Sequence, residues 1–345
     1  MNNSYTFHSI FQNADDKKDT IVEIDGLGKA CFINSSDVPY FLFIPNNLSN
    51  EDRLVFEANN CETNNYDKLK ENAFDNILRL VSVFKSEVPV MVPIIPSYDN
   101  RPYYQQLSGD MFYEREYANY PDKINDIIGD AIQKIESITG VKLDDKIFMN
   151  GYSSSAVFAQ RFALFHPERI DTLCVGGASG SIPVPTTKIE YPCGVGGLSN
   201  FDSESYKKIK FRYYVGEYET VNDAKVSYEH RHNNRVDLID GSFKYADRPM
   251  HDMTYFPRSM DPLIGKKYRD LFGTNYFERL KNVVKLYEDI GIDMKSDIVK
   301  GRAHRRLRAN GIEYLGVAEI GDKIVENTYN ESKAVLKNIE EEKKL

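Results

Sequence analysis

The sequence predicts an α/β protein, built on a mostly parallel sheet with helices on both faces. Short apolar runs typical of buried strands alternate along the chain with segments whose apolar residues recur every three or four positions, as in amphipathic helices. Such alternation produces βαβ units, in which successive strands run parallel. In addition, residues 88–96 are almost continuously apolar, which is typical of a strand buried on both faces.

Eight strands and four helices are predicted in chain order. Seven of the strands are mostly apolar runs, at 30–33, 40–45, 54–58, 88–96, 146–150, 170–175 and 209–215. The eighth is expected at 293–299. The helices have apolar side chains at helical spacing and cover residues 74–84, 124–135, 156–165 and 277–287. Gly140 and Gly291 follow the second and fourth helices, and glycine favours the end of a helix.

Two segments interrupt this alternation, near residues 180–206 and 224–268. We interpret them as cap-like insertions over one edge of the sheet, within a single domain that spans residues 1–345. They are rich in aromatic side chains: Tyr191, Phe201, Tyr228, Phe243, Tyr245, Tyr255 and Phe256. These side chains either cap an apolar pocket or pack the insertions onto the sheet, and the sequence leaves both alternatives open.

Composition narrows the class of protein. Of the 345 residues, 41% are hydrophobic and 28% charged, as in an ordinary globular protein. The mean hydropathy is −0.50, and no run approaches the roughly 18 apolar residues of a membrane-spanning helix. With 44 basic and 52 acidic residues, the net charge of −8 argues against nucleic-acid binding through phosphate neutralisation. Nothing in the composition indicates an oligomeric state.

Cysteine usage limits the chemistry further. Cys31, Cys61, Cys174 and Cys193 form no C-x-x-C pair and no cluster with zinc-ligand spacing. We expect free, mostly buried thiols in a reducing compartment, and neither a metal nor an organic cofactor. The first residues lack the basic and apolar regions of a signal peptide, which favours a cytoplasmic location.

A candidate nucleophile lies between a predicted strand and the helix that follows it. Residues 151–155 read G-Y-S-S-S, close to the G-x-S-x-G pattern of a nucleophile elbow, with Ser155 in place of the last glycine. A serine on such a sharp turn projects its hydroxyl above the sheet, beside the unpaired N–H groups of the helix start. Ser153 is therefore the predicted nucleophile. The alternative is that the three serines only cap the helix.

His304 is the predicted general base among six histidines. It follows the strand at 293–299 through a loop that contains Gly301, and therefore lies at the same edge of the sheet as the elbow. His166 ends the helix that begins near Ser153, roughly 20 Å away at 1.5 Å per residue. His8 precedes the sheet. His230, His232 and His251 lie in the second insertion and follow no strand.

The acid that orients this base is predicted just after the strand at 209–215. Glu219 is the first choice, Asp223 the alternative, and Glu217 the third candidate. Each could instead be a solvated loop acid. The order Ser153, Glu219, His304 matches the chain order of nucleophile, acid and base in one group of serine hydrolases.

These features resemble the α/β-hydrolase superfamily, and bacterial esterase-like members in particular. The resemblance covers about residues 41–304. It implies an eight-stranded, mostly parallel sheet with a catalytic triad at its carboxyl edge. It also implies an oxyanion hole, formed by the N–H of Ser154 and by an N–H of the loop at 59–61, for which we take Asn60. The His-Gly pair that is usual in that loop is absent here.

The predicted function is hydrolysis of an ester through an acyl-enzyme, with a small-molecule or acyl substrate. Ser153 attacks the carbonyl, His304 takes its proton, and Glu219 orients the imidazole. A peptidase or amidase would use the same triad. A non-catalytic binding protein that keeps the fold is the third alternative, and the altered elbow and loop favour it.

Overall fold

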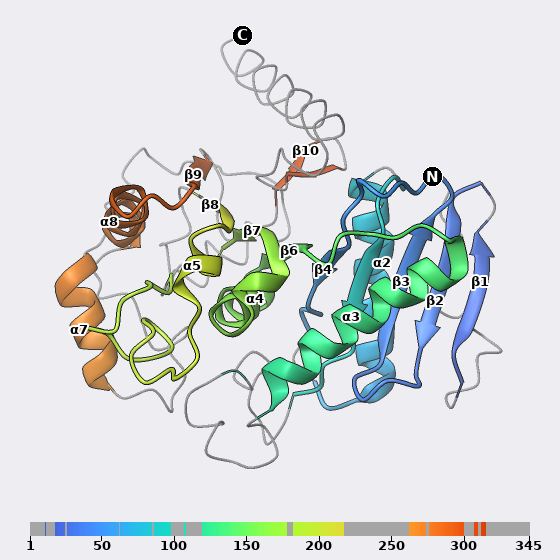
Figure 1. The fold of residues 1–345 in the computed structure, drawn as a ribbon, viewed down its shortest axis with the longest axis horizontal. Helices are drawn as coiled ribbons and strands as arrows, with labels where there is room; N and C mark the ends of the chain where they lie inside the picture. Colours follow the sequence, from blue (N-terminus) through green and yellow to red (C-terminus); the bar gives the residue numbers. More distant parts are fainter. Residues whose placement is uncertain are drawn as a thin grey trace, which may run out of the picture.

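The computed structural model describes most of the chain from Phe11 to Tyr314. The described residues are 11, 18–24, 26–61, 63–84, 86–97, 107, 119–177, 182–216, 262–273, 276–299, 307–309 and 312–314. Their helices and strands surround a nine-stranded sheet (Figure 1). Within these ranges, no helix is long and apolar enough to cross a membrane.

The sheet has the strand order β1-β2-β3-β5-β4-β6-β7-β8-β9. Its strands are β1 (Thr20–Ile24), β2 (Gly28–Ile33), β3 (Tyr40–Pro45), β4 (Val55–Glu57), β5 (Val90–Pro93), β6 (Ile147–Tyr152), β7 (Ile170–Gly176), β8 (Lys210–Gly216) and β9 (Met294–Val299). The strands from β5 to β9 in this order all run parallel, whereas β1, β2 and β3 pair antiparallel at one side. The predicted fold class, α/β with a mostly parallel sheet, is confirmed.

The sheet has nine strands rather than the predicted eight. All eight predicted strands are present, with ends that differ by a few residues. The additional strand is β1, which pairs with β2 from Thr20↔Phe32 to Ile24↔Gly28. Its residues are mostly half-buried or exposed because it lies at the edge of the sheet. It therefore lacks the apolar run that predicts the buried strands.

The four predicted helices are confirmed as α2 (Tyr66–Val83), α3 (Tyr120–Thr139), α4 (Ser154–Phe165) and α8 (Tyr276–Asp289). Gly140 ends α3 as predicted: its φ of 75° suits glycine, and its N–H donates to the Glu136 carbonyl over 2.8 Å. Further elements, which the sequence did not predict, are η3 (Pro167–Arg169), α5 (Ser203–Tyr206), α7 (Pro262–Phe272), β10 (Leu307–Ala309) and β11 (Ile312–Tyr314).

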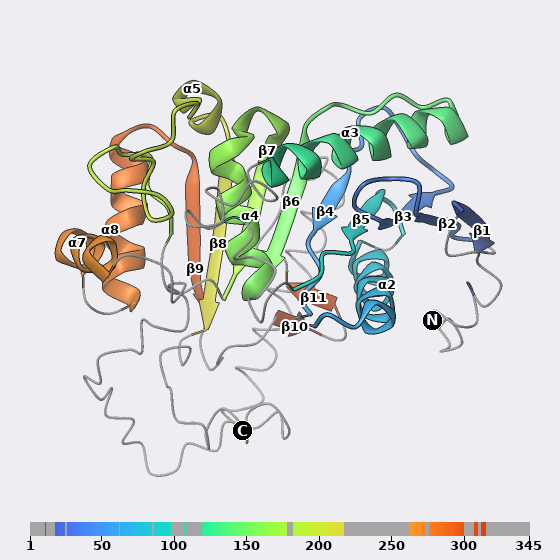
Figure 2. The ribbon, with the colours of Figure 1, turned by 90° about the horizontal axis from the view of Figure 1, so that it is seen from below.

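Helices cover both faces of the sheet (Figure 2). On one face, Phe74 and Ile77 of α2 pack in an apolar core with side chains of β2, β3 and β5. On the other face, α3, α4, α7 and α8 contribute Ile128, Phe162 and Tyr287 among others to a larger core. The sheet is thus enclosed between two apolar layers, as parallel sheets require.

The first predicted insertion is described from residue 182 onward, and its aromatic side chains pack against the helices. The ring centroid of Tyr191 lies 5.3 Å from that of Phe165, which is the last residue of α4. Phe201 packs on Tyr206, whose hydroxyl is 2.7 Å from the hydroxyl of Tyr287. For these residues, the packing alternative is favoured. The second predicted insertion lies outside the described residues, except for the part that forms α7.

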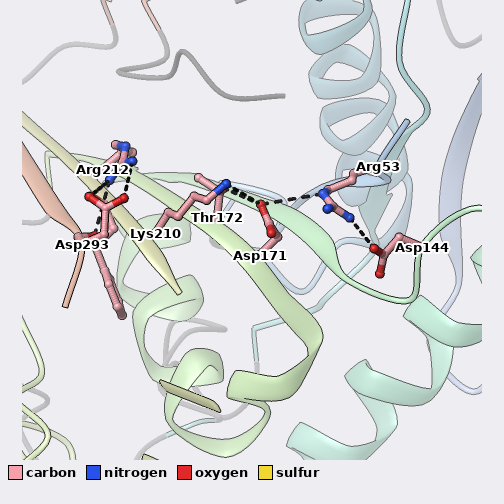
Figure 3. A network of polar contacts seen from close by, with 8 residues as sticks. Arg53, Asp144, Asp171, Thr172, Lys210, Arg212 and Asp293 are labelled. Carbon is pink, nitrogen blue, oxygen red and sulfur yellow. Dashed lines mark hydrogen bonds and ion pairs between the residues drawn. The ribbon is translucent and has the colours of Figure 1, made fainter. Parts of the chain in front are cut away.

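Charged side chains link the starts of the parallel strands, at the amino edge of the sheet (Figure 3). Arg53, just before β4, contacts Asp144 over 2.8 Å and Asp171 of β7 over 3.7 Å. Asp171 also lies 3.7 Å from Lys210, the first residue of β8. Burial raises the pKa of Asp144, but the hydrogen bonds from Arg53 and from the Lys146 N–H, together with the positive charges of both residues, lower it by more, so the pKa lies below the usual value.

The same edge ends in a bidentate ion pair between β8 and the start of β9. The guanidinium of Arg212 donates to both carboxylate oxygens of Asp293, over 3.0 and 2.9 Å. Arg212 is buried, so the pair is shielded on one side. Its hydrogen bond is the main cause that lowers the pKa of Asp293 below the usual value for aspartate.

We expect this pair to make part of the stability depend on acid pH. Because the pKa of Asp293 is lower in the folded chain than in the unfolded chain, the unfolded chain binds the proton first as pH falls. The contribution is therefore fully present above the unfolded value of about 3.9 and is lost as pH falls through the lower folded pKa. Urea unfolding between pH 7 and pH 2.5 should show a shallower loss of stability for Asp293→Asn than for the wild type. Equal slopes would contradict this assignment.

Candidate active site

Ser153 occupies a sharp turn between β6 and α4, at the carboxyl edge of the sheet. Tyr152 is the last residue of β6 and Ser154 the first of α4, so Ser153 alone connects strand and helix. Its φ of 58° and ψ of −118° are those of the first central residue of a type II′ turn, a position that favours glycine. A serine held there costs about 1–3 kcal/mol, and such strain is concentrated at functional sites.

The side chain of Ser153 does not act as a helix cap. Ser153 is the residue before α4, but it makes no capping hydrogen bond through its side chain. Its backbone is held instead: its N–H donates to the Gly176 carbonyl over 2.9 Å, and its carbonyl accepts from Val157 N–H over 3.1 Å. The capping alternative therefore does not account for Ser153, whose side chain is half-buried at the turn.

Gly151 allows α4 to begin directly above the end of β6. A Cβ at this position would lie 2.6 Å from the Ser155 carbonyl oxygen and 2.7 Å from Ala156 Cα. These are backbone atoms of the helix, which have no flexible end to move aside. Only glycine fits, which explains the first residue of the G-Y-S-S-S motif.

Ser155, which stands where the usual motif has glycine, is fully buried and hydrogen-bonded to the turn. Its hydroxyl accepts from Tyr152 N–H over 2.8 Å and donates to the Tyr152 carbonyl over 3.0 Å. The replacement of glycine thus adds two hydrogen bonds across the turn that carries Ser153.

The loop after β4 reaches the same turn. Asn60, half-buried, donates its side-chain Nδ2 to the Tyr152 carbonyl over 3.2 Å. Its neighbour Asn59 is buried, and its side chain makes two hydrogen bonds to the backbone of Ile95. The Asn59 Oδ1 accepts from the Ile95 N–H over 3.0 Å, and the Asn59 Nδ2 donates to the Ile95 carbonyl over 3.2 Å. The structure therefore brings the Asn60 side chain to the turn that carries Ser153. The oxyanion role of the Asn60 and Ser154 N–H groups stays a prediction.

A buried ion pair lies in the strands beneath the turn. Glu57, the last residue of β4, is 0% exposed, and its Oε1 lies 2.7 Å from Arg79 NH2 of α2. Its Oε2 accepts from Asn150 Nδ2 over 2.5 Å. Glu57 and Asn150 are register partners, so the carboxylate joins β4, β6 and α2 one residue before Gly151. This network fixes the strand from which the turn emerges.

The predicted base and acids lie outside the described residues: His304, Glu219, Asp223 and Glu217. The strands that precede them are described. β8 and β9 run parallel to β6, and their last residues, Gly216 and Val299, are register partners. Both strands therefore end side by side at the edge that carries Ser153.

His166 follows the last residue of α4, at the end of the helix away from Ser153. Its two ring nitrogens lie 3.0 Å from Asp122 and 3.1 Å from Glu168. The predicted free cysteines are confirmed: Cys31, Cys174 and Cys193 are buried, and Cys61 is partly exposed. Burial raises the pKa of the Cys31 thiol to about 12, which keeps it protonated.

Comparisons with known proteins give similarity of fold at very low sequence identity. No family model matches the chain, and no curated protein matches it. A poly(3-hydroxybutyrate) depolymerase, LpqC, from Bordetella parapertussis shares 11% identity over 87% of each chain, with a TM-score of 0.48.

Two further solved structures are similar to the same extent. Poly(aspartic acid) hydrolase-1 from Sphingomonas sp. KT-1 shares 12% identity over 84% of this chain and 94% of its own, with a TM-score of 0.44. A carboxylesterase from Mesorhizobium loti shares 10% identity over 82% and 94%, with a TM-score of 0.43. Similarity of this extent carries no conclusion about the reaction of this chain.

Two features of the site were missed by sequence reasoning. The bonds that Ser155 makes are invisible in a pattern that treats it as an imperfect glycine. Glu57 did give a signal, since it is the one charged residue in an apolar strand segment (Leu54, Val55, Phe56, Glu57, Ala58). A carboxylate there is normally paired, but nothing in the sequence identifies Arg79 as the partner.

Proposed function

We propose that the chain is a serine hydrolase that cleaves an ester through an acyl-enzyme at Ser153. The observation that carries the proposal is the backbone of Ser153, held at a strained glycine-like conformation between the end of a central parallel strand and the start of a helix. Strain of this kind persists only where the surrounding structure enforces it, and it is typical of functional positions. The side chain at such a turn faces the edge where sites form in open α/β sheets.

In this proposal His304 is the general base and Glu219, or alternatively Asp223, orients it. Two strands separate β6 from β9, so at about 4.8 Å per strand their ends are roughly 14 Å apart. A loop from the end of β9 can span that distance. The N–H groups of Ser154 and Asn60 would stabilise the oxyanion, and each such donor contributes on the order of 10²- to 10³-fold to the rate.

Labelling with a fluorophosphonate probe tests the nucleophile. We expect the wild-type protein to be labelled covalently, with the adduct mapped by mass spectrometry to Ser153, because an activated serine attacks phosphorus as it attacks an acyl carbon. Ser153→Ala should not be labelled. If the wild type is not labelled, the alternative of a non-catalytic binding protein with this fold is favoured.

A substrate panel then separates esters from amides. Esters and amides that carry the same acyl group should show hydrolysis of the esters and little hydrolysis of the amides. Faster cleavage of amides than of esters would favour a peptidase or amidase with the same residues.

A further inference from the structure

We propose that Ser155 and Asn60 are positioning residues, whose side chains clamp the peptide that joins Tyr152 to Ser153 in its catalytic orientation. This inference rests on the proposed role of Ser153 as nucleophile. It assigns a function to the two places where the chain departs from the usual α/β-hydrolase pattern: a serine in place of the last glycine of the elbow, and an asparagine in a loop that lacks His-Gly.

The clamp converges on one carbonyl. The Tyr152 oxygen accepts from Ser155 Oγ over 3.0 Å and from Asn60 Nδ2 over 3.2 Å. The N–H of Tyr152 donates back to Ser155 Oγ over 2.8 Å, so this hydroxyl both donates and accepts. On the other side of the peptide, Ser153 N–H donates to the Gly176 carbonyl over 2.9 Å. Both polar groups of the Tyr152–Ser153 peptide are therefore bonded, which fixes its plane.

Fixing this plane matters because the residue that follows it is strained. Rotation of the peptide changes φ of Ser153, and the strained φ of 58° would relax toward an ordinary value if the peptide were released. Relaxation would swing the Ser153 hydroxyl away from its position above the sheet. A misplacement of about 1 Å can cost on the order of 10²-fold in rate.

The contact from Asn60 has a second consequence. Asn60 and Ser154 carry the two predicted oxyanion donors, and these come from separate loops. The Asn60 side chain bonds to the residue two positions before Ser154, so it ties the loop after β4 to the elbow. Asn59 anchors the other side of that loop to Ile95, after the end of β5. The clamp therefore sets the separation of the two donors as well as the orientation of the nucleophile.

Removal of the two side-chain groups, singly and together, tests the clamp. Ser155→Ala keeps the Cβ and removes only the hydroxyl, and Asn60→Ala keeps the backbone N–H. We expect each to lower kcat for ester hydrolysis, and the rate of fluorophosphonate labelling, by roughly tenfold with KM nearly unchanged. Because both groups hold the same carbonyl, the double variant should lose more than the product of the two single losses.

Two control variants separate positioning from general loss of stability. Asn65→Ala removes the N-terminal cap of α2, in the same loop region as Asn60. The Asn65 Oδ1 accepts a hydrogen bond from the Lys68 N–H. Thr172→Val removes a buried hydroxyl at the opposite edge of the sheet. Both control variants should lower the melting temperature. At an assay temperature well below the melting temperature, both should keep the wild-type kcat.

Hydrogen exchange of the peptide that covers residues 147–157 gives a readout that needs no turnover. This peptide should exchange faster in Ser155→Ala and Asn60→Ala than in the wild type. In the two control variants it should exchange at the wild-type rate. If the wild type is neither labelled nor active but the clamp variants exchange faster, the proposed hydrolase function is wrong and the clamp is supported. A labelled wild type, with clamp variants that react and exchange at its rate, would overturn the clamp alone.

Discussion

Replacement of Ser153 by alanine is expected to lower kcat for ester hydrolysis on the order of 10⁴- to 10⁶-fold, which is the cost of removing a nucleophile that acts as one unit with its base. The neighbouring serines are not expected to replace it. The Ser155 hydroxyl is fully buried and bonded to both polar backbone groups of Tyr152. Ser154 is the first residue of α4, on the helix and past the turn. Steady-state hydrolysis of a chromogenic acyl ester measures the loss.

A glycine at the same position gives a second, independent readout. Both Ser153→Ala and Ser153→Gly remove the hydroxyl, but only glycine adopts φ of 58° with ψ of −118° at little cost. Ser153→Gly should therefore be more stable than Ser153→Ala by about 1–3 kcal/mol in urea unfolding, while both are inactive. Ser137→Ala, an exposed serine of α3, serves as the control and should retain wild-type activity. Activity within tenfold of wild type in either Ser153 variant would reject Ser153 as nucleophile.

Replacement of Glu57 by leucine is expected to lower the free energy of unfolding by about 3–5 kcal/mol. The reason is that Glu57 is fully buried, and its two oxygens contact Arg79 over 2.7 Å and Asn150 over 2.5 Å. Leucine leaves a largely buried guanidinium without this carboxylate and the Asn150 amide without this acceptor. Urea unfolding at neutral pH measures the change.

The double variant Glu57→Leu/Arg79→Met separates the loss of an ion pair from the loss of packing. Removing both charges should restore much of the stability, because an apolar pair replaces the buried ions without leaving one of them uncompensated. Glu204→Ala is the matched control: its ion pair with Lys207 has a similar distance, 2.9 Å, but the Glu204 side chain is 78% exposed. It should cost no more than about 1 kcal/mol. A Glu57→Leu variant as stable as this control, or a double variant less stable than Glu57→Leu, would contradict the assignment.

The arrangement of the sheet could be predicted from the sequence because each element carried its own local signal. The strands from β2 to β8 are largely apolar runs, whereas edge strand β9 is mixed in polarity, and α2, α3, α4 and α8 show helical spacing. Edge strand β1 had no such run, since one of its sides meets solvent, and α7 was hidden within a segment interpreted as an insertion. The fold class followed because strand–helix alternation leaves few topologies.

The candidate site could be predicted only in part. The position of Ser153 followed from the strand–turn–helix context, but its strained backbone conformation is a property of three dimensions. The bonds from Ser155 and Asn60 to Tyr152 join positions that no local pattern relates. Asn60 and Tyr152 are far apart in the chain and adjacent only because β4 and β6 pair. Glu57 and Arg79 meet for a similar reason, since α2 packs back against the sheet that contains β4.

The ion pairs of Arg53 and Arg212 lie at one end of the strands, and Ser153 lies at the other. A mutation that changes the charges at the amino edge should change the stability of the protein to acid or heat, and the length of the central sheet separates it from the proposed nucleophile. Substitutions at the carboxyl edge would in turn alter the proposed site, while the ion pairs at the amino edge stay intact. Directed evolution could therefore change stability at the amino edge and the proposed site at the carboxyl edge independently.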